Sequence, residues 1–337
     1  MKLLLTGGLG YIGSHTALEL LRKGYDICII DNLSNSESFI LDRLEQISGK
    51  GIQFIEMDIC RQKDFLKLAD YHFDSIIHFA AKKSVPESIQ HPNLYYQNNL
   101  VGLINLMQFA EDRGIHKIVF SSSCTVYGKP LQIPVSEGEL TKLSDSPYGN
   151  TKKWAEEILQ EYARLKVSMR IVLLRYFNPV GADQSGLMGE LPRGIPSNLM
   201  PYITQTAAGL RDYLRIYGND YSTSDGTAIR DYIHVSDLAA AHISALEYAE
   251  KMIHGSEIFN IGTGNGYSVL EMIETFQEIN RVKLDYRFAP RRDGDLEQIW
   301  ADPSKALVEL NWKAKYTLND MVSSAWSWQQ NLMQEKF

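Results

Sequence analysis

Short apolar runs alternate with longer amphipathic stretches over the first half of the chain. The runs are apolar at successive positions, as expected for strands that are covered on both faces of a parallel sheet. The stretches between them have helical periodicity, so the pattern predicts right-handed strand–helix–strand units and an α/β fold. The expected strands are residues 3–5, 27–30, 52–55, 75–80, 117–121 and 171–174.

The pattern changes after Asn178. Residues 181–201 are rich in Gly, Pro, Ser and Asn, which predicts a loop, and short strands follow irregularly at 215–217, 230–234, 257–261 and 283–288. We therefore expect two domains. Residues 1–177 form a Rossmann-type doubly wound parallel sheet, and residues 178–337 form a smaller α/β substrate-binding domain. A return of the chain to the first domain near residues 234–249 is compatible with the pattern.

Composition narrows the class of protein. The 337 residues are 44% hydrophobic and 22% charged, which suits a sizeable core, and the net charge of -7 argues against a nucleic-acid surface. No apolar stretch approaches the roughly 20 residues of a membrane span. Cys28, Cys60 and Cys124 lack metal-ligand spacing, and the histidines show no paired ligands. We expect no metal site, no membrane contact and a reducing, cytoplasmic location.

A glycine-rich turn, Thr6-Gly7-Gly8-Leu9-Gly10-Tyr11-Ile12-Gly13, joins the first expected strand to the first expected helix. Glycines permit a tight turn and a close approach of the backbone to a pyrophosphate, and the following helix directs its free N–H groups at that anion. Such turns are common, but this one lies between a strand and a helix and precedes a second strand ending in Asp31. It predicts a dinucleotide site.

Asp31 selects between the two nicotinamide dinucleotides. Its carboxylate can accept hydrogen bonds from both hydroxyls of the adenosine ribose, and its charge would repel a 2′-phosphate. No Lys or Arg stands in residues 32–36 to offset that repulsion. The sequence therefore predicts NAD rather than NADP.

The spacing Tyr-x-x-x-Lys occurs twice, as Tyr148/Lys152 and as Tyr162/Lys166. It places both side chains on one helix face, where the ammonium can lower the tyrosine pKa. A tyrosine base working near neutrality needs a shift of roughly 3 units from about 10, equivalent to about 4 kcal/mol. Only the first pair begins a helix and faces a strand end, which carries Ser123. We interpret the second pair as a solvated pair farther along the helix.

These features together resemble the extended short-chain dehydrogenase/reductase family, and within it the members that epimerise UDP-sugars. The resemblance covers nearly the whole chain and is specific in the second half. Besides the glycine turn, the segments that carry it include 77–81 (Ile-His-Phe-Ala-Ala), 120–128 (Phe-Ser-Ser-Ser-Cys-Thr-Val-Tyr-Gly), 174–181 (Leu-Arg-Tyr-Phe-Asn-Pro-Val-Gly) and 230–235 (Arg-Asp-Tyr-Ile-His-Val).

The resemblance implies a permanently held NAD and a UDP-sugar substrate. The implied reaction interconverts UDP-galactose and UDP-glucose, in galactose metabolism, by reversible oxidation at sugar C4 through a bound 4-ketose. Tyr148, Lys152 and Ser123 are the implied catalytic residues. The cofactor residues are Gly7, Gly10, Tyr11, Ile12, Gly13, Asp31, Asn32, Asn35, Ser36, Asp58, Ile59, Phe79, Ala80, Lys83, Asn98, Ser123, Tyr148, Lys152 and Phe177. The substrate residues are Ser123, Tyr148, Asn178, Asn198, Leu199, Tyr217, Arg230, Arg292, Asp295 and Ile299.

Two alternatives stay open at this point. A sugar-nucleotide 4,6-dehydratase carries an Asp-Glu pair after the strand-end hydroxyl, where this chain has Cys124 and Thr125. A non-catalytic dinucleotide sensor often lacks the tyrosine and the lysine, both of which are present here. The resemblance also leaves open whether N-acetylated UDP-sugars are accepted, because Ile299 is smaller than the tyrosine found in some bacterial members.

The expected helix over residues 100–110 is apolar nearly all round. A helix on one face of a sheet needs a single apolar stripe, so the surplus predicts a second buried face. We expect that face to form a homodimer, joined by Trp154, Ile158 and Tyr162 from the helix of the catalytic pair. Burial within the same chain is the alternative.

Overall fold

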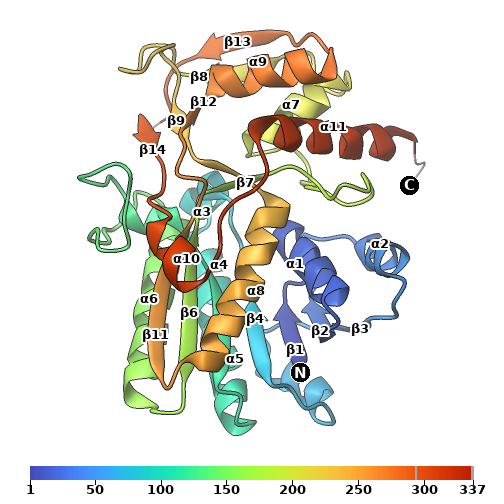
Figure 1. Ribbon diagram of the computed structural model, residues 1–337, viewed down its shortest axis with the longest axis vertical. Helices are drawn as coiled ribbons and strands as arrows, with labels where there is room; N and C mark the ends of the chain where they lie inside the picture. Colours follow the sequence, from blue (N-terminus) through green and yellow to red (C-terminus); the bar gives the residue numbers. More distant parts are fainter. Residues whose placement is uncertain (293, 335–337) are drawn as a thin grey trace.

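The computed structural model describes residues 1–292 and 294–334. Its centre is a sheet of seven parallel strands in the order β11-β6-β5-β4-β1-β2-β3 (Figure 1), which confirms the Rossmann-type fold. The strand order reverses between β1 and β4, and ligands bind at such a point. The strands are β1 Lys2–Thr6, β2 Asp26–Asp31, β3 Gln53–Glu56, β4 Ser75–His78, β5 Lys117–Ser123, β6 Arg170–Tyr176 and β11 Gly255–Ile261.

The apolar runs form strands because both faces of the sheet are covered. Leu3 and Leu5 of β1 pack into one core and Leu4 into the opposite one, and none of the three side chains is exposed. Cys28 of β2 is likewise fully buried, as its apolar surroundings in the sequence predict. Burying a leucine side chain contributes roughly 1.5–3 kcal/mol, so a strand buried on both faces is strongly favoured.

Helices cover the two faces. The core on one side includes residues of α1, α2 and α8, and the core on the other side includes residues of α5 and α6. Residues 97–101, just before α5, form a π-helical turn. The helices of this part are α1 Tyr11–Arg22, α2 Phe39–Ser48, α3 Val85–Gln90, α4 Pro92–Tyr96, α5 Gly102–Asp112, α6 Pro147–Leu165 and α8 Val235–Lys251.

The seventh strand comes from beyond residue 178. The chain leaves the central sheet after β6 and returns to it with α8, which packs against α1. β11 then pairs with β6 along its whole length. The sheet therefore draws on residues that are far apart in the sequence.

Apart from α10, which packs against β11, the remaining elements gather at the carboxyl end of the sheet (Figure 1). α7, α9 and α11 share a third core. The strand expected at 230–234 is divided at Asp231, because β9 pairs with β12 and β14 whereas β10 pairs with β7. The elements are β7 Asn178–Val180, α7 Leu199–Ala207, β8 Leu214–Tyr217, β9 Ile229–Arg230, β10 Tyr232–His234, β12 Tyr267–Ser268, α9 Val269–Asn280, β13 Tyr286–Ala289, β14 Gln298–Ile299, α10 Ser304–Glu309 and α11 Leu318–Gln334.

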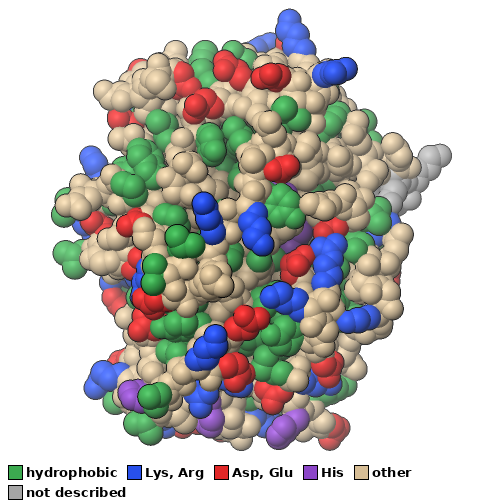
Figure 2. Space-filling view, viewed as in Figure 1, with side chains coloured by type: hydrophobic (Ala, Val, Ile, Leu, Met, Phe, Trp, Pro, Cys, Tyr) green, Lys and Arg blue, Asp and Glu red, His purple; other side chains and the backbone are tan. Residues whose placement is uncertain are grey.

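Within residues 1–292 and 294–334, no helix is long and apolar enough to cross a membrane. The same residues contain no cluster of three or more His, Cys, Asp or Glu side chains suited to a metal ion. Acidic and basic side chains are interspersed on the face shown in Figure 2.

Two glycines have nearly the same backbone conformation but different surroundings, so substitutions there distinguish the cost of backbone strain from the cost of steric crowding. Gly7 has φ +68° and its missing Cβ would lie 2.7 Å from the backbone nitrogen of Ala80, whereas Gly49 has φ +67° and open space around it. We predict that Gly49→Ala lowers the free energy of unfolding by about 1 kcal/mol, from backbone strain alone. Gly7→Ala should lower it by about 2–4 kcal/mol, because a backbone must also shift. Urea titration measures both, and equal losses would contradict the close approach.

Candidate active site

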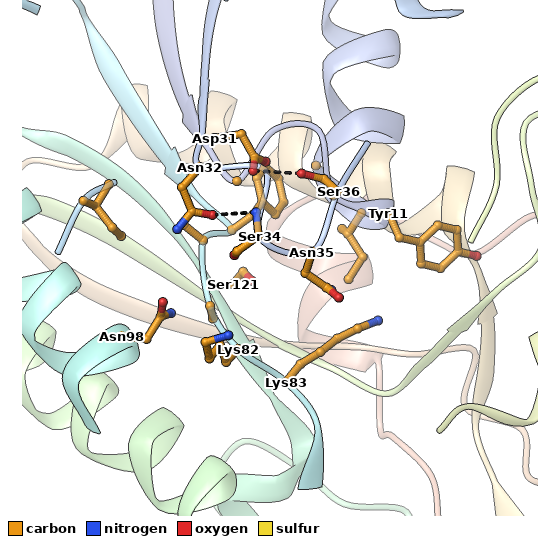
Figure 3. Close-up of a pocket in the computed structure, with 18 of the residues that line it drawn as sticks. Tyr11, Asp31, Asn32, Ser34, Asn35, Ser36, Lys82, Lys83, Asn98 and Ser121 are labelled. Atoms are coloured by element: carbon orange, nitrogen blue, oxygen red, sulfur yellow. Dashed lines mark hydrogen bonds between the residues drawn. The ribbon is translucent and has the colours of Figure 1, made fainter. Parts of the chain in front are cut away.

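A cleft of about 1060 Å³ lies over the glycine turn, where the strand order reverses. The loop Asp31–Ser36 forms one wall, and Lys82, Lys83 and Asn98 lie on the other (Figure 3). All the expected cofactor residues line this cleft except Ser123 and Phe177. Residues lining it that sequence reasoning missed are Ile30, Ser34, Met57, Ala81, Lys82, Ser121, Ser122 and Tyr176.

The glycine turn leaves its backbone open toward the cleft. A Cβ on Gly13 would lie 2.4 Å from the carbonyl oxygen of Gly7, so the turn is too tight for a side chain there. Gly10 is the residue before α1, and a Cβ there would meet only that same oxygen, at 3.3 Å. The free N–H groups at the start of α1 thus face the space that a pyrophosphate would fill. This cradle fits a dinucleotide.

Asp31 ends β2 and organises the loop that follows it. Its Oδ1 accepts hydrogen bonds from the N–H of Leu33 (2.9 Å) and the hydroxyl of Ser36 (2.9 Å), and its Oδ2 accepts one from the N–H of Leu9 (3.1 Å). A carboxylate has about four acceptor positions, so one remains on this wall of the cleft. The remaining position suits one ribose hydroxyl, rather than the two expected from the sequence, because three positions are already used by the protein.

Asn99 connects the opposite wall of the cleft to α6. Its side chain accepts the N–H of Lys82 (2.9 Å) and donates to the carbonyl of Lys82 (3.0 Å) and the hydroxyl of Thr151 (3.0 Å). Asn99 is buried, and sequence reasoning missed it because its partners are distant in the chain. It holds the backbone before Lys83 against α6.

Tyr148 lies in the first turn of α6. Ser146 caps this helix by accepting the N–H of Gly149 (3.2 Å), and Pro147 suits the first helical position. Burial raises the pKa of Tyr148 to about 12, while a side-chain hydrogen bond with Ser123 acts to lower it. The structure thus joins the strand-end serine and the tyrosine, as the sequence predicts.

Lys152 lies one turn farther along α6 and is 5% exposed. Its Nζ donates to the carbonyl of Ser121 (2.5 Å) and lies 4.8 Å from the centre of the Phe120 ring. Burial lowers the Lys152 pKa to about 8, although the negative charge of Glu156 opposes the shift. The ammonium is therefore directed at the end of β5 rather than hydrogen-bonded to Tyr148.

A buried ion pair supports this arrangement and was missed by sequence reasoning. Glu156 accepts hydrogen bonds from the hydroxyl of Ser122 (2.5 Å) and from Nη2 of Arg175 (2.6 Å). The Glu156 and Arg175 side chains are 2% and 3% exposed, and the guanidinium lies 4.7 Å from the Tyr127 ring centre. The one available signal was the spacing, since Glu156 follows Lys152 by a helical turn. Its contacts hold α6 against β5 and β6.

The expected substrate residues fall into two groups. In the first, Arg230 forms an ion pair with Asp295 and donates to the carbonyl of Leu296 (2.6 Å), and the guanidinium of Arg292 lies 4.0 Å from the Tyr217 ring centre. In the second, Asn198 and Leu199 stand at the start of α7, where the Asn198 amide donates to Glu190 (2.6 Å).

A small apolar cluster places the first group of expected substrate residues against the end of β5, which carries Ser123. Ile299 lies beside Arg230 in the β9–β14 pair and packs in one cluster with Phe177, Val126 and Cys124. The backbone of Asp231 receives the N–H of Asn178 (2.9 Å) and donates to the carbonyl of Ile299 (3.2 Å). Phe177 thus lies between the substrate elements and β5 rather than in the lining of the cleft.

Arg193 reaches the loop after β2 from the second half of the chain. Its Nε donates to Glu37 (2.7 Å), and Nη1 and Nη2 donate to the carbonyls of Ser34 (3.0 Å) and Ser36 (2.8 Å). No Lys or Arg stands within residues 32–36, so no local signal announces this cation. Because Glu37 pairs with it, the positive charge is balanced.

Comparison with known proteins identifies the family. The sequence profile described as GDP-mannose 4,6 dehydratase matches residues 4–325. The chain is 48% identical over 332 residues to a UDP-glucose 4-epimerase of Bacillus subtilis (strain 168), an alignment that spans 98% of this chain and 97% of the relative. The chain belongs to the UDP-glucose 4-epimerase family. This confirms the resemblance within the extended short-chain dehydrogenases/reductases.

Solved structures of the family superimpose closely. The fold is similar to a UDP-glucose 4-epimerase of Stenotrophomonas maltophila, with a TM-score of 0.96, 45% identity and 99% of each chain covered. That protein was crystallised with NAD and formylated UDP-arabinopyranose. The epimerase of Bifidobacterium longum, in complex with NAD⁺ and UDP, gives a TM-score of 0.95 at 44% identity, with 98% of each chain covered.

The burial of Lys152 leads to a prediction about how the free energy of unfolding depends on pH. Because the folded-state pKa of Lys152 is about 8 and the unfolded value about 10.5, the unfolded chain binds more protons in this window, so stability rises with pH there. Relative to Lys152→Met, the free energy of unfolding of the apoprotein should increase by about 3 kcal/mol between pH 8 and pH 10.5. Urea midpoints measured across this range test it, and a constant difference would contradict the shift.

Proposed function

We propose that this chain interconverts UDP-galactose and UDP-glucose by reversible oxidation and reduction at sugar C4, with NAD held as a retained cofactor. The observation that carries the proposal is that Tyr148 and Lys152 both line the dinucleotide cleft, and that Tyr148 is hydrogen-bonded to Ser123, just outside its lining. The epimerase relatives, with their NAD and UDP-sugar complexes, support the same reaction.

The chain's own residues would hold the cofactor along the cleft. The backbone of the glycine turn receives the pyrophosphate, Asp31 the adenosine ribose, and Asp58 and Ile59 flank the adenine. Lys83 and Asn98 line the rest of the groove. When bound, NAD supplies the acceptor and donor of a hydride at sugar C4.

Tyr148 is the base in this proposal. As phenolate it accepts the proton of the sugar 4′-hydroxyl, directly or through the Ser123 hydroxyl, and returns it later in the cycle. Burial raises the Tyr148 pKa to about 12, so the phenolate needs nearby positive charge. Lys152 provides part of it, and the cationic nicotinamide ring the rest.

The second half of the chain anchors the nucleotide. Arg230 and Arg292 suit the diphosphate, Asp295 suits the uridine ribose, and Tyr217 offers an apolar face to the base. Asn178, Asn198, Leu199 and Ile299 complete the proposed site. Holding the UDP moiety while the 4-keto sugar turns needs binding energy remote from the reacting carbon. Re-reduction from the other face then inverts C4.

The two alternatives are not favoured. Cys124 and Thr125 occupy the positions of the dehydratase Asp-Glu pair, and burial raises the Cys124 pKa to about 12, so its thiol stays protonated near neutrality. A sensor without chemistry would have no use for a tyrosine and a buried lysine at the cleft. The proposed division of labour is that residues 1–177 bind the cofactor and supply Tyr148 and Ser123, while the elements of the second half that lie outside the central sheet anchor the UDP-sugar.

The assembly proposed is a homodimer. Val101, at the end of the π-helical turn, and Ile104 of α5 are 44% and 50% exposed, although the opposite side of α5 is buried in the core. Trp154 of α6 lies beside Tyr96, with ring centres 5.7 Å apart. An apolar strip of this kind suits a second copy of the chain. The cytoplasm is the proposed location, since all three cysteines are free thiols.

Replacing the proposed base tests the mechanism. Tyr148→Phe should lower kcat for UDP-galactose by about 10³-fold, because only the hydroxyl is lost. The matched control is Tyr162→Phe, which removes the hydroxyl of the second Tyr-x-x-x-Lys spacing on the same helix and should leave kcat unchanged. UDP-glucose formation without added NAD is the measurement. Near-normal turnover by Tyr148→Phe would refute the assignment.

A charge placed on α5 tests the dimer. Ile104→Glu should convert the protein to a monomer in sedimentation velocity, because a carboxylate would be buried without a partner. Leu66→Glu, at a position that is 76% exposed, should leave the dimer intact. A wild-type protein that sediments as a monomer at every concentration would contradict the proposal.

A further inference from the structure

Residues 189–193 (Gly-Glu-Leu-Pro-Arg), here called the strap, carry two charged side chains that bind opposite walls of the cofactor cleft. Arg193 contacts the loop that follows β2, and Glu190 contacts Lys83, which follows β4. In the sheet β1 lies between β2 and β4, so the glycine turn lies between the two attachment points. The strap therefore spans the part of the cleft that suits the pyrophosphate.

The Arg193 attachment uses all three kinds of guanidinium nitrogen. Nε binds the Glu37 carboxylate, and the two terminal nitrogens bind the carbonyls of Ser34 and Ser36. Ser34 and Ser36 line the cleft themselves. Three hydrogen bonds from one rigid fork restrict this loop more than a single ion pair would.

The second attachment is made by Glu190, which is largely buried although its partner Lys83 is 44% exposed. The Glu190 side chain is 10% exposed, and its Oε1 receives Nζ of Lys83 (3.1 Å) and the amide of Asn198 (2.6 Å). Oε2 is buried and has no hydrogen-bond partner among the residues that the structure describes. A buried acceptor without a donor is unfavourable, so a hydroxyl brought by a bound ligand would satisfy it.

The strap is fixed to the second half of the chain. The indole Nε1 of Trp328, in α11, donates to the carbonyl of Glu190 (3.1 Å). Gly189 packs so closely on this indole that a Cβ would lie 2.4 Å from it. Movement of the strap away from the cleft would have to disturb this contact as well.

A second cavity shows that the strap faces the same space. It is lined by Glu190 and Arg193 and shares Gly10, Tyr11, Asn35 and Lys83 with the cofactor cleft. Lys83 and Asn35 belong to the two walls seen in Figure 3. A dinucleotide leaving the cleft on this side would have to pass beneath the strap.

We propose that Arg193 and Glu190 are positioning residues that slow the release of NAD by holding both walls of the cleft closed. The proposal rests on the proposed function, in which NAD is retained between turnovers. Neither residue belongs to the lining of the cleft that holds Tyr148 and Lys152, so we expect their effect to be on the residence time of the cofactor.

The experiment measures cofactor release directly. Holoenzyme loaded with radiolabelled NAD⁺ is mixed with excess unlabelled NAD⁺, and protein-bound label is followed by gel filtration. Arg193→Gln should release label roughly tenfold faster than wild type. The release rate of Arg193→Lys should fall between those of wild type and Arg193→Gln, because a single ammonium nitrogen cannot reach all three acceptors that the separate guanidinium nitrogens bind. Glu37→Gln should have a smaller effect than Arg193→Gln, since the two carbonyl bonds remain.

Arg164→Gln is the matched control. It removes another exposed ion pair, with Glu161 on α6, and should leave the release rate unchanged. If wild type retains its label and Arg193→Gln loses label no faster than wild type, the proposed role of the strap is refuted while the proposed function stands. If wild type exchanges its label within one turnover, NAD is not retained and both proposals fail.

Discussion

The cleft exists because the backbone of Gly7 can approach that of Ala80. The two residues lie just beyond the paired ends of β1 and β4, and their contact leaves no room for a side chain. Gly13 imposes the same condition one turn later, where α1 begins. Together they fix the distance between the end of one strand and the start of one helix. The positions of Asp31 on one wall and Lys83 on the other follow from that distance, because β2 and β4 flank β1.

The arrangement of the proposed catalytic side chains depends on a different constraint, which is the burial of charged groups away from water. Lys152, Glu156 and Arg175 lie in the interior at the junction of α6 with β5 and β6. Their desolvation is compensated by the Glu156–Arg175 pair and by the carbonyl of Ser121. The low pKa of Lys152 is the residual cost of that burial. The site thus keeps a lysine near its titration point, where a change in neighbouring charge alters its protonation.

Much of the cofactor cleft could be predicted from the sequence because its determinants are local. The glycine turn, Asp31 and the strand-end Ser123 each stand next to the element that positions them. The β11 strand was expected as a strand, and a return of the chain near residues 234–249 was compatible with the pattern, but the pairing with β6 was not predicted, because no local pattern specifies the neighbour of a strand. Arg193 and Asn99 were missed for the same reason. Their partners lie in segments that meet only after folding.

The place of β11 has a consequence for how the two parts of the molecule relate. The chain crosses between them after β6, again before α8, and again after β11. A polypeptide ending at residue 177 would lose the strand that pairs with β6 and leave one edge of this seven-residue, largely apolar strand unpaired, which favours aggregation. Several covalent connections also restrict rigid-body opening about a single hinge. The sugar therefore has to turn within a cleft whose two sides are joined repeatedly by the same chain.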